Sequence, residues 1–139
     1  MSKPDANRRI VLDTHTLLWW QAGSSRMSTN ALRAISAAAF VLVSPISFWE
    51  ISMLVQKGRI GLDRPTTKWV TDFESTSGVE IAPLTPAIAV LAGELVDFHG
   101  DPADRILVAT AASFGVPLIT KDEKIHAYAK PGASLTALW

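Results

Sequence analysis

The sequence predicts an α/β fold in which a central parallel sheet of about five strands lies between layers of helices. The first observation is a short apolar run, residues 10–12, which is rich in β-branched side chains and is followed at once by a helical pattern. Such a run is typical of a strand buried on both faces, as strands of a parallel sheet are. The second observation is that strand and helix patterns alternate along the chain, which implies βαβ crossovers.

The composition indicates one folded domain. The chain has 139 residues, of which 48% are hydrophobic, and this suffices for a full core. The sequence has no cysteine, no recognisable secretory signal and no apolar run of the ~20 residues that a membrane span needs, so we expect a cytoplasmic protein. Thirteen basic residues balance thirteen acidic ones, which excludes the strongly basic surface of a general nucleic-acid binder.

The expected elements follow from helix caps, first-turn prolines and glycines that end helices. Ser44 and Pro45 begin a helix that Gly58 ends, and Asp101 and Pro102 begin another. The expected helices are residues 14–21, 29–38, 46–57, 66–75, 87–98, 102–114 and 122–129, and the expected strands are residues 10–12, 40–43, 79–84, 116–120 and 134–138. Residues 1–8 are polar and are expected to form a mobile leader before a single domain over residues 9–139.

Two aspartates are predicted to lie at the carboxyl edge of the sheet, where open α/β sheets bind their ligands. Asp13 ends the first strand, and Asp122 follows the fourth strand with Thr120 just before it. Taken alone, each aspartate is equally well explained as the cap of the helix that follows it.

Three further acids stand on predicted helices near this edge. Glu50 lies among apolar residues of its helix, so it either reaches solvent at the rim or points into a polar site, and we favour the polar site. Asp101 and Asp104 are both typical of the start of a helix, and this structural role alone is enough to explain them. A functional role is compatible with it, because Asp101 can cap the helix while Asp104 faces the edge of the sheet.

Gathered together, these carboxylates imply a cation. They repel one another, and some must take up protons unless a positive charge joins them. Oxygen ligands without cysteine indicate Mg²⁺ or Mn²⁺, and Mg²⁺ typically takes one or two carboxylates, several waters and phosphate oxygens of the substrate. The predicted chemistry is metal-assisted phosphoryl transfer.

Three segments, VLDTHTLLWW (11–20), SPISFWEISMLVQKGRI (44–60) and HGDPADRILVATAASFGVPLITKDEKIHAY (99–128), together resemble PIN-domain ribonucleases. More narrowly, they resemble the VapC toxins of type II toxin–antitoxin systems, from about residue 10 to residue 139. The resemblance implies a PIN-like three-layer fold. It also implies that the family's acidic catalytic residues and metal ligands are Asp13, Glu50, Asp104 and Asp122, with Thr120 and Asp101 as accessory residues.

The resemblance further implies a Mg²⁺-dependent endoribonuclease that cleaves RNA, forms homodimers and is inhibited by a cognate VapB antitoxin. We expect Mn²⁺ to substitute for Mg²⁺. Five basic residues near the acids in sequence are candidate phosphate contacts, although ordinary surface solvation is the better explanation for any single one: Lys57, Arg59, Arg105, Lys121 and Lys124. Arg105 has a second alternative, an ion pair with an acid of its own segment.

Aromatic residues in apolar helical runs are expected in the core or at an interface rather than as platforms for RNA bases. These residues are Trp19, Trp20, Phe48 and Trp49. An antitoxin or a second protomer is expected to dock on whatever part of that surface is exposed.

Two other functions remain open. In the first, the chain is a catalytically inert PIN-like binding subunit whose acids are all helix caps. In the second, it is a small-molecule phosphatase with Asp13 as the nucleophile, which is disfavoured because no second acid stands two residues after Asp13 and no glycine follows.

Overall fold

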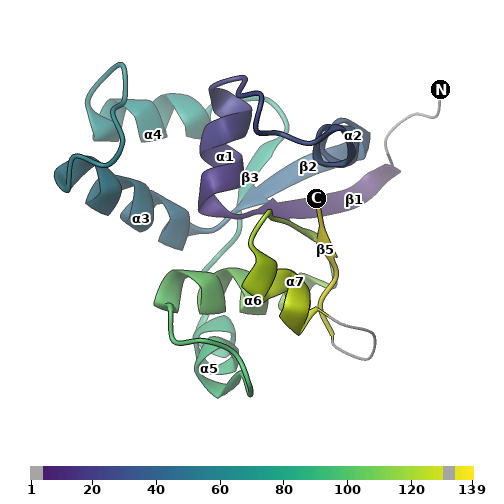
Figure 1. The fold of residues 1–139 in the computed structure, drawn as a ribbon. Coiled ribbons are helices and arrows are strands. Elements are labelled where there is room, and N and C mark those ends of the chain that lie inside the picture. The colour runs from purple at the N-terminus through teal and green to yellow at the C-terminus, as the bar shows by residue number, and fades with distance from the viewer. Residues whose placement is uncertain (1–4, 130–133) are drawn as a thin grey trace.

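A computed structural model describes residues 5–129 and 134–139, and within them five strands form one parallel sheet (Figure 1). The strand order is β3-β2-β1-β4-β5. The strands are β1 (Asp5–Leu12), β2 (Ala38–Val43), β3 (Val79–Ile81), β4 (Leu118–Ile119) and β5 (Ala137–Leu138). The predicted α/β fold with about five parallel strands is therefore confirmed.

Helices cover both faces of the sheet, which makes the three layers (Figure 1). They are α1 (Thr14–Gln21), α2 (Thr29–Ala37), α3 (Pro45–Gln56), α4 (Thr66–Glu74), α5 (Pro86–Glu94), α6 (Pro102–Phe114) and α7 (Glu123–Tyr128). No helix in the described ranges has both the length and the apolar character to cross a membrane.

Alternate side chains of β1 enter two different cores. Ile10 and Leu12 pack with Leu17 and other residues of the helices on one face, whereas Val11 packs with Leu107 on the other. All five of these apolar side chains are almost completely buried. This burial on both faces is what the apolar run predicted.

The strand order reverses beside β1, because the chain continues from β1 to β2 on one side and returns much later as β4 on the other. Leu12 is paired with Ile119, and the backbone N–H of Asp13 donates to the carbonyl of Ile119 at 3.2 Å. Such a reversal leaves a crevice outside the carboxyl ends of the two strands. Asp13 and Thr120 therefore begin the loops that border this crevice.

Several element boundaries differ from those predicted. Residues 5–8 belong to β1 instead of the leader, because Asp5 is paired with Ala38 of β2. Residues 1–4 of the predicted leader lie outside the described residues. The strands β3 and β4 are shorter than expected, since Pro83 and Pro117 beside them have no N–H to donate to a neighbouring strand.

Candidate active site

Asp13 lies at the end of β1 with only 8% of its surface exposed. Its Oδ1 accepts a hydrogen bond from the N–H of Thr16 at 2.8 Å and thereby caps α1. Its Oδ2 accepts a hydrogen bond from the hydroxyl of Thr120, which stands just after β4. Asp13 is thus both the cap of α1 and a carboxylate held in a fixed position at the crevice. The interpretation of Asp13 as a helix cap and its interpretation as a site residue are therefore compatible.

Thr120 connects two of the predicted acids. Its side chain is fully buried, and its hydroxyl oxygen accepts the N–H of Asp122 at 3.0 Å while donating to Asp13. Asp122 in turn caps α7, since its Oδ1 accepts the N–H groups of Lys124 at 2.8 Å and Ile125 at 3.3 Å. Thr120 is therefore a positioning residue that fixes the spacing between the two strand-end aspartates.

Asp104 lies in the first turn of α6, where Asp101 caps the helix by accepting the N–H of Asp104 at 3.2 Å. The pKa of Asp104 is raised from 3.8 to about 7, first by burial and then by repulsion from the carboxylates of Asp101, Asp122, Glu50 and Asp13. Nε2 of His99 lies 3.2 Å from Oδ2 of Asp104, although this contact lacks the geometry of a hydrogen bond. Burial and the neighbouring carboxylates therefore both disfavour the ionised form of Asp104.

The structure brings all five predicted acids to one hollow of about 630 Å³ at the crevice. Within the described part of the chain, Asp104 is the only one of these acids that has a basic group within 4.0 Å. The acids that line this hollow, which we call the acidic hollow, are Asp13, Glu50, Asp101, Asp104 and Asp122. Their roles as ligands and catalytic residues stay predictions.

The donor set fits a hard divalent cation that keeps part of its water. No three histidine, aspartate or glutamate side chains in the described ranges are grouped to hold an ion by themselves. Mg²⁺ does not need such a cage, since one or two carboxylates, several waters and substrate oxygens complete its coordination. The five acids offer only carboxylate oxygens, and their combined negative charge favours a cation there.

We expect Asp104→Asn to stabilise the protein at pH 8 in the absence of divalent cations. Because the folded protein holds a proton on Asp104 up to a pKa of about 7 and the unfolded chain releases it near 3.8, the stability of the wild type falls as pH rises between these values. Asparagine does not titrate, so the stability of the variant does not fall with pH for this reason. Thermal melts in EDTA should show a melting temperature about 5 °C higher at pH 8 and no difference below about pH 4.

The structure gives Arg105 a structural role, and its contact with RNA phosphate stays a prediction. The guanidinium of Arg105 donates to five backbone carbonyls at 2.9–3.2 Å, those of Ala92, Gly93, Leu95, Phe98 and His99. The carbonyls of Ala92 and Gly93 belong to the last turn of α5 and that of Leu95 to its C-cap, where the helix dipole is negative. Arg105 therefore caps α5 and holds the loop that leads to Asp101, and it forms no ion pair with an acid of its own segment.

The other four basic candidates lie in different places. Lys121 is exposed and lines the acidic hollow. Arg59 is exposed and lines a neighbouring groove, whereas Lys57 is exposed and lines neither cavity. Lys124 is exposed and lines a small cavity together with Asp101, Asp104 and Asp122. Of the predicted phosphate contacts, Lys121 and Lys124 therefore lie at the predicted acids.

Sequence reasoning missed the basic and aromatic side chains around the acids. His15, Trp19 and Arg26 line the acidic hollow, His99 lies beside Asp104, and Nε2 of His126 lies 2.7 Å from the carbonyl oxygen of Thr120. His15 and Trp19 lie one turn apart on α1, but Arg26, His99 and His126 come from other segments, so no single spacing rule links the whole set. Only the position of His15 two residues after Asp13, at the start of α1, indicated that it lies near the edge of the sheet.

The fold and the acidic hollow together define a small α/β protein with a carboxylate site at the carboxyl edge of a parallel sheet. A family model described as "PIN domain" matches residues 10–131. The chain belongs to the PIN domain family.

The chain is 36% identical over 123 residues to Ribonuclease VapC22 of Mycobacterium tuberculosis, and this match covers 88% of the chain and 93% of the relative. Among solved structures it resembles VapBC2 from Rickettsia felis bound to a promoter DNA fragment, with a TM-score of 0.63 and 16% identity over 94% of this chain and 97% of that one. It also resembles VapBC-5 from M. tuberculosis, with a TM-score of 0.59 and 20% identity over 94% and 98% of the two chains. These structures support the PIN-like fold.

Proposed function

We propose that the protein is a Mg²⁺-dependent endoribonuclease and the toxin of a VapBC toxin–antitoxin pair. The observation that carries this proposal is the acidic hollow, in which Asp13, Glu50, Asp104 and Asp122 converge and burial with mutual repulsion raises the pKa of Asp104 to about 7. The match to a relative named as a ribonuclease supports RNA as the substrate. We expect Mn²⁺ to replace Mg²⁺, since both prefer oxygen ligands.

The chain's own residues prepare the site for a phosphodiester. Thr16 and Thr120 each bind one oxygen of Asp13, so this carboxylate keeps one orientation when charged groups enter. The hydrogen bonds at the start of α7 fix Asp122 in the same way. A bound divalent cation supplies an activated water and neutralises the charge that develops on the phosphate. Asp13 and Asp104 are the ligands we assign first.

The proposal includes a protein partner. The two structures named above are those of VapBC systems, and we propose a VapB-type antitoxin as the partner of this chain as well. Trp49 of α3 is 51% exposed, and an exposed tryptophan of this kind fits a protein interface. We also propose that the protein forms a homodimer. An interface with the antitoxin or with a second copy of the chain would cover apolar side chains that are otherwise exposed to water.

Divalent cations are expected to raise the melting temperature of the wild-type protein. Mg²⁺ or Mn²⁺ that binds the folded state alone stabilises it by about 2.7 kcal/mol at a hundredfold excess over the dissociation constant. Asp13→Asn and Asp104→Asn should each reduce the shift, because each removes a charge from the acidic hollow. Asp63→Asn serves as the control, since Asp63 pairs with Arg64 away from the hollow. A melting temperature that is independent of Mg²⁺ and Mn²⁺ would favour the inert binding subunit.

A further inference from the structure

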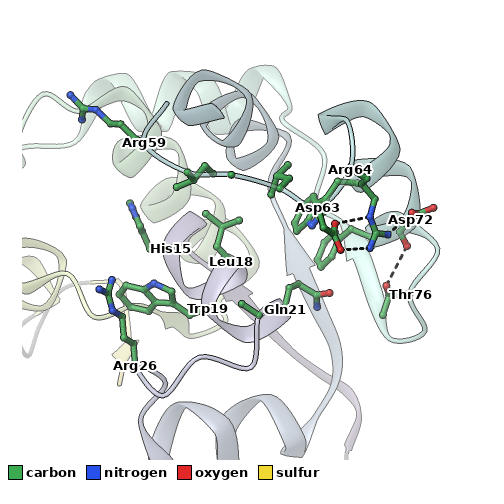
Figure 2. Close-up of a pocket in the computed structure, with 16 residues that line it drawn as sticks. His15, Leu18, Trp19, Gln21, Arg26, Arg59, Asp63, Arg64, Asp72 and Thr76 are labelled. Carbon is green, nitrogen blue, oxygen red and sulfur yellow. Dashed lines mark hydrogen bonds and ion pairs between the residues drawn. The ribbon is translucent and has the colours of Figure 1, made fainter. Parts of the chain in front are cut away.

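A second cavity adjoins the acidic hollow. It is a groove of about 700 Å³ between α1, α4 and the loop that joins α3 to α4 (Figure 2). The two cavities have three lining residues in common, His15, Trp19 and Arg26. These three side chains therefore form the junction between the acids and the groove.

Two cations are held against the same indole ring at this junction. The guanidinium carbon of Arg26 lies 5.6 Å from the ring centroid of Trp19, and Nζ of Lys121 lies 5.9 Å from it. The ring itself packs against the rings of His15 and Trp139 at centroid distances of 5.9 and 5.8 Å. Cation–π contacts at these distances restrict long side chains that would otherwise be free in solvent.

Neither cation is neutralised by a carboxylate. No acidic oxygen lies within 4.0 Å of Arg26 or Lys121 in the part of the chain whose side chains the structure describes. The other end of the groove is different, because Arg64 is paired there with Asp63 and Asp72 (Figure 2). The positive charge at the acidic end of the groove thus remains available for an anion from outside.

We propose that Arg26 and Lys121, held on Trp19, bind backbone phosphates of a single-stranded RNA segment next to the bond that is cut. This inference rests on the proposed ribonuclease function. Lysine and arginine that contact phosphates position a nucleic acid without reading its sequence. The strand then runs from the acidic hollow across the junction into the groove, whose lining includes Arg59 as a further cation. This path also explains how a chain without net charge holds RNA, since the positive charge is local.

The test is the double variant Arg26→Ala with Lys121→Ala, compared with the parent in an Asp13→Asn background that prevents cleavage. The probe is a fluorescein-labelled single-stranded oligoribonucleotide of mixed sequence, followed by fluorescence anisotropy at several salt concentrations. The dissociation constant should rise about tenfold at 50 mM salt. The slope of log K against log salt should become shallower by about 1.4, since each lost phosphate contact removes about 0.7.

Matched controls separate a phosphate site from a general effect of charge. Arg33→Ala removes an exposed arginine on α2 that lines neither cavity, and it should leave affinity and slope unchanged. Arg26→Lys with Lys121→Arg keeps both charges and should retain the parent slope. In the cleaving protein, the double alanine variant should raise KM about tenfold and leave kcat within about twofold, as loss of uniform binding does.

An unchanged dissociation constant and salt slope in the double variant would overturn the proposal. A protein partner would then be the better explanation for the exposed cations at the junction. A loss of kcat without a change in affinity would overturn it as well. Failure of the proposed function would show in a separate measurement, namely a wild-type protein that binds the oligonucleotide but does not cut RNA with Mg²⁺.

Discussion

Asp13→Asn is expected to abolish the Mg²⁺-dependent cleavage of RNA by the purified protein once any antitoxin has been removed. Asn has the same shape and its carbonyl oxygen can still accept the N–H of Thr16, so the cap of α1 survives. The variant loses the negative charge at the carboxyl edge of the sheet, and its amide NH2 group cannot accept the hydrogen bond that the hydroxyl of Thr120 donates to Oδ2 of Asp13. Because a loss of about 4 kcal/mol in transition-state stabilisation corresponds to about 10³ in rate, we expect a decrease of that order. Gel analysis of a labelled RNA over time measures it.

The matched control for this experiment is Glu74→Gln, which removes an exposed carboxylate at the end of α4 that lines neither the acidic hollow nor the groove. It should cleave RNA like the wild type. Cleavage that persists in Asp13→Asn after repurification, with nuclease contamination excluded, would contradict the proposed mechanism. A trapped phosphoryl group on Asp13 would instead support the phosphatase alternative.

Arg105→Ala is expected to destabilise the protein by about 3 kcal/mol and to lower its melting temperature by about 10 °C. The physical reason is that one guanidinium satisfies five carbonyls, and three of them stand at the end of α5 and in the residue after it. Removing a charged donor leaves partly buried acceptors without a partner. Thermal and urea unfolding, monitored by circular dichroism, measure the change.

Arg105→Lys should recover little of this stability. The ammonium group of a lysine is compact, so it cannot donate hydrogen bonds to all five carbonyls at once as the wider guanidinium does. Arg33→Ala, an exposed arginine of α2, should change stability by less than about 0.5 kcal/mol. If Arg105→Ala keeps full stability but loses affinity for RNA, the result would contradict the capping role and support the predicted contact between Arg105 and RNA phosphate.

Most helix boundaries could be predicted because their signals are local. Ser44, Thr85 and Asp101 each accept an N–H within the first turn of the helix that follows, and these contacts span only two or three residues. The end of α5 was predicted about four residues too late, at residue 98 instead of Glu94. The contact with Arg105 at this end comes from the next helix, so no signal near residue 94 reveals it.

The acids of the site could be predicted for a similar reason. Asp13 and Asp122 stand directly after strands of a parallel sheet, and strand ends of such a sheet share one edge whatever the details of packing. The raised pKa of Asp104 could be anticipated only in direction, since its size depends on burial and on the distances to the other carboxylates.

The sequence by itself determined the fold class, most helix starts and the acids that meet at the edge of the sheet. Each of these follows from hydrogen bonds within a turn or from the alternation of strands and helices. The tertiary structure alone decided that Arg105 caps α5 and that Arg26 and Lys121 share the ring of Trp19. Lys121 and Trp19 are about a hundred residues apart in the chain. Contacts of that range depend on how the crossovers pack the helices against the sheet, and no local pattern encodes the result.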